Sequence, residues 1–156
     1  MALEFWDVIS QSKGEVAKLG PILEGLSDEE VTEFGKTFYE NLIKLNRWSI
    51  WGAGYVMAGG MGDDAFHYFR SWIIGKGKEA FETALANPDE LGQFASEGDD
   101  FENELLEYVA IDVLEGRGLG DPRELVDGFA DDDPEGEAWD EDTIDALYPK
   151  LAARFG

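Results

Sequence analysis

The chain has 156 residues, the length of one ordinary domain, and 44% of them are hydrophobic and 13% aromatic. This composition excludes a disordered chain, because it supplies enough apolar surface to form a core. Thirty-five acidic residues against twelve basic ones give a net charge of −23. Such a molecule repels nucleic acid and anionic membranes, so we expect it to bind neither.

The sequence also bears on location and chemistry. It contains no cysteine, which excludes disulfides, a thiol nucleophile and zinc sites of the cysteine-rich kind. No apolar run reaches the roughly 18 residues that a membrane span requires, and the N-terminal segment lacks the pattern of a signal peptide. We therefore expect a cytoplasmic protein without a cofactor.

The acidic charge is concentrated in the second half of the chain. Residues 1–86 hold 13 acids and 8 bases, whereas residues 87–156 hold 22 acids and 4 bases, which gives −5 and −18. Solubility or a salt-rich proteome explains such an excess. The alternative is a surface that meets a basic partner or imitates a phosphate backbone.

The N-terminal part is predicted to form three helices. The first spans Leu3–Gly14, and the second begins at Glu15, where Gly20-Pro21 is expected to break or kink it. Ser27 and Glu30 form the capping-box pattern at the start of the third. Its apolar positions then recur at spacings of 3 and 4, which indicates an amphipathic helix, and they are Val31, Phe34, Phe38, Leu42 and Leu45.

The middle of the chain is predicted to form the aromatic core. Helical spacing over Trp48–Ala58 includes Gly52 and Gly54, whose cost inside a helix indicates close packing at both positions. A glycine-rich turn follows, and Asp63 is placed to cap the next helix, over Asp64–Ile74. We expect four aromatic side chains to be largely buried here: Trp51, Phe66, Phe69 and Trp72.

The remainder is predicted as shorter helices and loops. These are a helix over Lys78–Leu85, a loop over 92–99, a helix marked by Phe101 to Val113, a helix from Asp121-Pro122 to Phe129, an acidic loop over Asp131–Glu137, and a final helix through Phe155 with a kink at Pro149. No segment alternates with a strand period. The sequence therefore predicts an all-α fold, a compact multi-helix single domain over residues 1–156.

Residues 51–78 contain motifs that are more specific than a helical pattern alone. Trp51-Gly52-Ala53, Gly59-Gly60, the run Asp63–Ile74 and Gly77-Lys78 together resemble the family known as domain of unknown function 4240. The resemblance covers about residues 1–90, and the acidic part over 91–156 matches more loosely. It implies a small bacterial cytoplasmic domain with no established activity, and it supplies no catalytic residues.

The best candidates for a ligand site lie on or beside the Asp64–Ile74 helix. His67 is the only histidine, and it is three residues from both Asp64 and Arg70, so the three share a helix face. In a functional interpretation, Asp63 or Asp64 orients His67 as a base and Arg70 binds an anion, with Tyr55 nearby. In the structural interpretation, the aspartates stabilise the helix N-terminus, His67 lies at the surface, and Arg70 pairs with an acid on a neighbouring helix.

The acidic loop partly matches a calcium-binding loop. Asp131, Asp133, Glu135 and Asp142 fall at loop positions 1, 3, 5 and 12 of an EF-hand, with glycine at position 6. Position 12, however, is Asp rather than the longer Glu, and a window this acidic produces such matches easily. We therefore predict a solvated acidic loop without a tight calcium site.

These observations favour a non-enzymatic protein-interaction or regulatory domain, with a basic protein as its expected partner. One alternative is a small-ligand-binding protein or enzyme with a pocket near Asp63, Asp64, His67 and Arg70. The other is an acidic mimic of nucleic acid, or an immunity-type inhibitor of a basic partner, built on residues 97–145.

Overall fold

The computed structural model describes residues 4–156, and within that range the chain is helices and loops, with no β-strand. This confirms the all-α fold class. None of these helices is long and apolar enough to span a membrane. In chain order the helices are α1 (Phe5–Ser12), α2 (Val16–Glu24), α3 (Asp28–Lys44), α4 (Trp48–Ala58), α5 (Asp63–Lys76), α6 (Lys78–Ala86), the 3-10 helices η1 (Pro88–Phe94) and η2 (Glu104–Tyr108), α7 (Val109–Gly116), the 3-10 helix η3 (Pro122–Leu125), α8 (Ile144–Leu147) and α9 (Pro149–Phe155).

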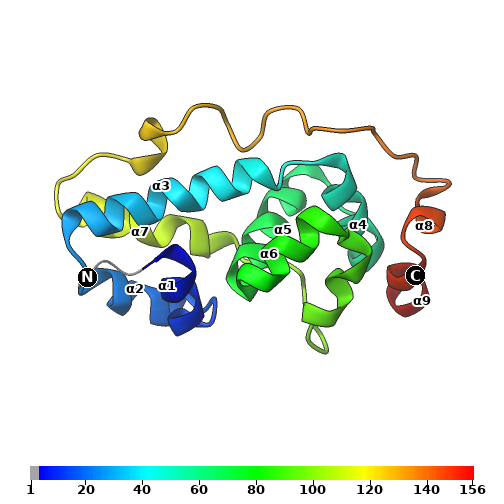
Figure 1. Cartoon of the computed structure of the whole chain (residues 1–156), viewed down its shortest axis with the longest axis horizontal. Helices are drawn as coiled ribbons and strands as arrows, with labels where there is room; N and C mark the ends of the chain where they lie inside the picture. The colour runs from blue at the N-terminus through cyan, green and yellow to red at the C-terminus, as the bar shows by residue number, and fades with distance from the viewer. Residues whose placement is uncertain (1–3) are drawn as a thin grey trace.

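The long helix α3 lies beside α7, with α1 and α2 packed at the same end of the molecule, whereas α4, α5 and α6 lie toward the other end, where α8 and α9 pack beyond α4 (Figure 1). Helix α5 contacts α3, α4, α6 and η2. Its aromatic residues explain this position, because Phe66, Phe69 and Trp72 are all buried, as expected. Trp51 is only partly buried, although it packs against the same core.

The start of α3 is fixed by local sequence. The hydroxyl of Ser27 accepts a hydrogen bond from the backbone N–H of Glu30, and the carboxylate of Glu30 accepts one from the N–H of Ser27. This is the predicted capping box, and it satisfies two helix-end donors that would otherwise lack partners. The first helix is also confirmed over Phe5–Ser12, while its predicted start at Leu3 lies outside the described residues.

The predicted break at Gly20-Pro21 is wrong. Helix α2 continues through Pro21 to Glu24, although proline removes one hydrogen bond from its ladder. The buried side chains of Leu19 and Leu23 lie on either side of this position. Burial of these leucines offsets the lost hydrogen bond, and the sequence pattern does not show how much burial each leucine reaches.

Beyond residue 86 several predicted boundaries differ from the structure. The predicted loop over 92–99 begins inside η1, and the helix marked by Phe101 starts only at Glu104, first as η2 and then as α7. Phe101 itself takes a positive φ of 59° and packs its ring against Trp72 and Phe155, at 5.6 Å from each. Tertiary contact therefore overrides helix propensity there.

The last two predicted helices are also shorter than expected. The helix predicted to reach Phe129 ends as η3 at Leu125, and the final helix is two separate helices, α8 and α9, divided before Pro149. At the division Tyr148 turns inward and its hydroxyl donates to the carbonyl of Ser49, 2.5 Å away. Burial raises the pKa of Tyr148 to about 12, so this donor keeps its proton.

Gly52 and Gly54 lie at close contacts, as predicted. A Cβ atom at Gly52 would stand 2.5 Å from the hydroxyl of Tyr148, and one at Gly54 would stand 2.7 Å from the sulfur of Met61. The close approach is made by side chains of α5, its preceding turn and the C-terminal segment. Helix α4 accepts them only because these two positions have no side chain.

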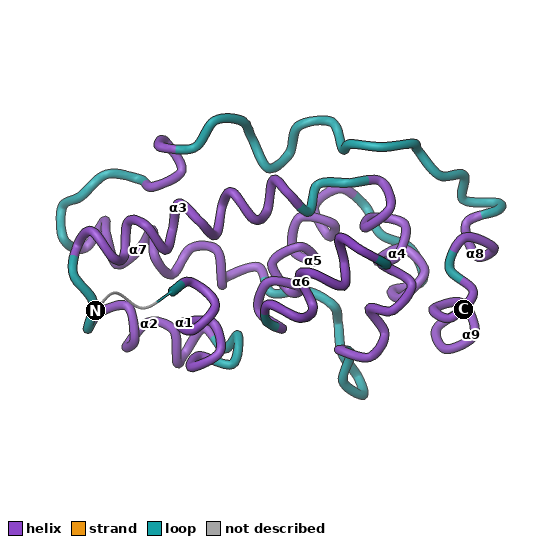
Figure 2. Tube along the Cα trace, in the orientation of Figure 1, coloured by secondary structure: helices purple, strands orange, loops and turns teal. Residues whose placement is uncertain are grey.

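Residues 126–143, which we call the strap, run across the molecule as an extended loop from η3 to α8 (Figures 1 and 2). The strap contains nine acidic residues and no basic one. It passes over the end of α3 and the start of α4, where Arg47 and Glu135 form an isolated parallel bridge. A segment so acidic stays in place only if the body of the molecule supplies partners for it.

Candidate functional site

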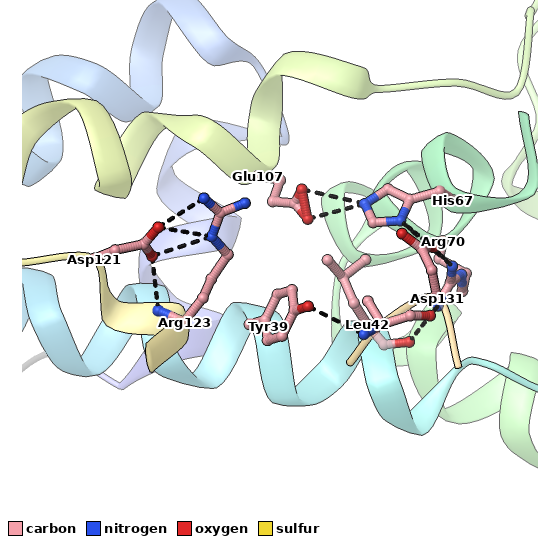
Figure 3. A network of polar contacts seen from close by, with 9 residues as sticks. Tyr39, Leu42, His67, Arg70, Glu107, Asp121, Arg123 and Asp131 are labelled. Carbon is pink, nitrogen blue, oxygen red and sulfur yellow. Dashed lines mark hydrogen bonds and ion pairs between the residues drawn. The ribbon is translucent and has the colours of Figure 1, made fainter. Parts of the chain in front are cut away.

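Arg70 of α5 is the main residue that holds the strap. Its side chain is only 1% exposed, and its Nη1 atom donates to the carbonyls of Leu42 at 3.0 Å and Ala130 at 2.5 Å. The other terminal nitrogen, Nη2, donates to Oδ1 of Asp131 at 3.0 Å (Figure 3). The guanidinium lies 4.6 Å from the centre of the Phe66 ring. Arg70 thus joins α5 to the end of α3 and to the strap.

His67, one helical turn before Arg70, lies between two carboxylates. Its Nδ1 atom is 2.8 Å from Oδ1 of Asp131, and its Nε2 atom is 2.9 Å and 3.2 Å from the two oxygens of Glu107 (Figure 3). The Glu107 side chain comes from η2 and is only 4% exposed. Because carboxylates only accept hydrogen bonds, both are satisfied at once when the ring carries two protons.

The charges of this network favour the protonated ring. Burial lowers the pKa of His67, but the hydrogen bonds and charges of Glu107 and Asp131 outweigh burial and hold that pKa above 6.5. For Arg70 burial is the larger effect and lowers its pKa, although Asp131 opposes the change. Burial raises the pKa of Asp131, but His67 and Arg70 together bring it below the ordinary value. The network is therefore held together by charge.

Further hydrogen bonds hold the strap along its length. The Tyr39 hydroxyl accepts from the N–H of Ala130 at 3.1 Å, and the buried side chain of Asn46 donates to the carbonyl of Asp132 at 2.6 Å. Backbone bonds then link Glu135 to Asn46 at 3.0 Å and to Trp48 at 2.9 Å. The first half of the strap is therefore fixed by backbone and side-chain contacts together.

Aromatic rings hold the second half. Trp51 stacks between Trp48 and Phe66, with ring centres 5.1 Å and 4.9 Å away. Trp139 of the strap meets Trp48 and Trp51 edge to face at 5.8 Å and 6.0 Å, and it lies 4.9 Å from Tyr55. Tyr55 thus contacts the strap. Both faces of Trp51 are covered, so it offers no open ring surface to a ligand.

A cleft of about 370 Å³ opens between the strap and the start of α5. Its walls combine this aromatic stack with carboxylates, and its lining residues are Asn46, Trp48, Trp51, Asp63, Asp64, Phe66, Arg70, Asp131, Asp132, Asp133 and Pro134. Four of the candidate residues named from the sequence are therefore close together, with Asp63, Asp64 and Arg70 in the cleft and His67 bonded to Asp131 behind it.

The contacts of these residues differ from those of a general base with its orienting acid. Asp63 and Asp64 are exposed, and Asp63 accepts from the N–H of Asp64 at 3.0 Å. Asp63 is the first residue of α5, after the N-cap Gly62, rather than the cap itself. Within residues 4–156 neither aspartate bonds to His67, whose two nitrogens face other carboxylates.

The same geometry bears on what the cleft can bind. With both nitrogens of His67 engaged, neither is placed to take a proton from a substrate in this conformation. The Nη atoms of Arg70 donate to groups of the protein, not toward the opening of the cleft. The structural interpretation expected Arg70 to pair with an acid on a neighbouring helix, but its partner Asp131 is on the strap. It also expected His67 at the surface, but the side chain of His67 is largely enclosed.

The calcium-loop match falls on the strap. The strap is extended there (Figure 2), and Asp131 bonds to His67 and Arg70 (Figure 3). Across residues 4–156 no group of three or more His, Asp or Glu side chains is placed to hold a metal ion. The geometry thus differs from that of an EF-hand, in which the loop wraps around the ion.

Three residues of this network were not named from the sequence: Tyr39, Asn46 and Glu107. Glu107 and Asn46 are polar residues that the structure buries. An isolated acid inside an apolar helical stretch is a weak signal of a buried ion pair. Their partners lie 40 and 86 residues away along the chain, so the sequence pattern alone does not reveal the pairing.

No curated protein and no solved structure matches the chain significantly. A family model does match it, over residues 2–115, and its description is "Protein of unknown function (DUF4240)". The matched region contains His67, Arg70 and Glu107, whereas the strap lies beyond it. Because the match covers more than half of the chain, this protein belongs to that family of unknown function, as the tryptophan, glycine and aromatic motifs of α4 and α5 had indicated.

Proposed function

We propose that this protein is a non-enzymatic interaction domain that binds a basic segment of a partner protein along the strap and the adjoining cleft. The observation that carries the proposal is the state of the charges at this cleft. Among the described residues that line it, Arg70 is the one cation, and it is buried and bonded to the protein itself. The carboxylates of Asp63, Asp64, Asp132 and Asp133 make no ion pair within the part of the chain that the structure describes.

The rigidity of this surface supports the proposal. The strap keeps its acids in fixed positions through Arg70, Asn46 and the tryptophan stack, so a partner meets a preformed array. Preformed charges favour fast association with an oppositely charged protein and lose less entropy on binding. Both faces of Trp51 are covered, so we expect the carboxylates that line the cleft to make the main contacts with a cation.

Two broader points belong to the same proposal. Residues 1–156 are taken as one domain, because a single hydrophobic cluster includes side chains from Val8 to Leu151. A cytoplasmic location is proposed, because the family resemblance described above implies it.

Binding of a fluorescein-labelled oligolysine of about eight residues, followed by fluorescence anisotropy, tests the proposal. The double variant Asp132→Asn/Asp133→Asn removes two cleft charges. We expect it to weaken binding about tenfold at low salt, because exposed ion pairs contribute up to about 1 kcal/mol each. The matched control is Asp112→Asn/Glu115→Gln, which changes net charge equally on exposed positions of α7.

The control separates a local site from general attraction. If the α7 variant weakens binding as much as the cleft variant, the peptide responds only to net charge and the proposed site is wrong. If the wild-type protein does not bind oligolysine even at low salt, the proposed basic partner is wrong. Binding that disappears at 0.3 M salt agrees with the exposed position of the carboxylates.

A further inference from the structure

A second surface lies apart from the cleft, at the opposite end of α3. A groove of about 600 Å³ runs between the first turns of α3 and residues 119–125. Its walls include two exposed leucines, which are Leu119 at 40% and Leu125 at 60% exposure. Among residues 4–156, none lines both this groove and the cleft.

The leucines stand on a rigid support. Arg117 donates to the carbonyls of Leu26 at 3.1 Å and Glu24 at 3.1 Å, and it pairs with Asp28 at 2.9 Å. On the other side of Leu119, Pro122 packs against Gly35, where a Cβ atom would stand only 2.6 Å from the proline ring. The turn that carries Leu119 is therefore anchored to α2 and α3, and Pro122 packs η3, which ends at Leu125, against α3.

The rim of the groove carries unpaired negative charge. Asp28 and Asp121 also line it, but each is paired with an arginine of the same region. Glu29, Glu33 and Glu124 have no ion-pair partner among residues 4–156. The groove thus combines uncovered leucine side chains with three free carboxylates, a combination that fits an apolar segment carrying positive charge.

We propose that this groove is a docking site for a basic amphipathic helix of a partner protein. The apolar stripe of that helix packs on Leu119 and Leu125, while its lysines or arginines face Glu29, Glu33 and Glu124. A second copy of this chain is the wrong occupant, because two molecules that each carry −23 repel one another across an acidic rim. The groove goes beyond the proposed function at the cleft and does not depend on it.

The test uses a peptide of about 14 residues with leucines at helical i, i+3, i+4 and i+7 spacing and lysines elsewhere, measured by anisotropy in 0.3 M salt. We expect the double variant Leu119→Ser/Leu125→Ser to weaken binding about tenfold, since apolar contact carries affinity when salt screens charge. The control is Leu105→Ser/Leu147→Ser, at leucines that are 61% and 60% exposed outside the groove. It should bind within about twofold of the wild type.

Each remaining outcome contradicts the proposal. Equal binding of a peptide with the same composition in scrambled order shows that no amphipathic stripe is recognised. Equal loss in both leucine variants shows that the groove is not the site. Unchanged binding in Leu119→Ser/Leu125→Ser rejects it directly. The Asp132→Asn/Asp133→Asn variant keeps this binding even if the cleft proposal is correct, so the failures of the two proposals are distinguishable.

Discussion

Replacing His67 with alanine tests whether the charge network is held together as described. The ring lies 2.9 Å from a Glu107 oxygen, and the Glu107 side chain is 4% exposed with no other hydrogen-bond donor in the described structure. The variant leaves a buried carboxylate unpaired, which costs about 3–5 kcal/mol of unfolding free energy. Asp131 adds little to this loss, because its side chain is 71% exposed and keeps its bond to Arg70.

The assay is urea denaturation followed by circular dichroism at pH 6.0, where the wild-type ring is protonated. A second substitution, Glu107→Gln, provides the decisive control. It should make the His67→Ala variant more stable by about 1–2 kcal/mol, because burying a neutral amide costs less than burying a carboxylate. A loss below about 1 kcal/mol for His67→Ala, or no rescue by Glu107→Gln, would refute the reasoning.

The same variant gives a pH dependence with a definite sign. The pKa of His67 in the folded protein is raised above its ordinary 6.5, so the ring contributes its full stabilisation below pH 6.5. That contribution is lost as pH rises through the folded-state pKa. We therefore expect the stability difference between wild type and His67→Ala to shrink from pH 6 to pH 9. A difference that grows over this range contradicts the assigned network.

Three other predictions concern the core, the glycines and the charge. Phe69→Ala should lower the free energy of unfolding by about 3–5 kcal/mol in urea denaturation, because the ring is fully buried. A loss below about 1 kcal/mol would contradict this burial. Gly52→Ala should cost about 1–3 kcal/mol, because its Cβ meets Tyr148. The control is Gly116→Ala at the exposed end of α7, where a Cβ meets nothing and the change should be near neutral; equal effects would contradict the close packing. The melting temperature should increase when the salt concentration is raised from near zero to 0.3 M, because salt screens the repulsion among the acidic residues of 87–156, whose net charge is −18. A decrease would mean that most of these acids are paired.

The helical class and the N-terminal elements follow from local rules. The capping box at Ser27 and the 3-and-4 spacing after it act within a few residues, so sequence alone predicts α3. The same holds for the buried stripe of α5, with Phe66, Phe69 and Trp72. Prediction was poorer after residue 86, where helices are short and contacts with distant residues set their ends.

The candidate site shows the same division. Helical spacing correctly grouped His67 with Arg70 on one face of α5, and their nitrogens lie 3.5 Å apart. It also suggested Asp64 as the partner of His67, yet the partners are Glu107 and Asp131. Spacing reports which residues share a face, but it does not report which distant segment covers that face.

The all-α fold, the aromatic core helices and the family can be predicted from the sequence, because helix periodicity, capping and the motifs of α4 and α5 depend on residues close together in the chain. The positions of the acidic residues depend instead on tertiary contacts. The tertiary structure bonds the strap to Arg70 and Asn46, buries Glu107 beside His67, and leaves Leu125 uncovered. These outcomes depend on hydrogen bonds and burial between segments far apart in the chain, whose energies no local pattern contains.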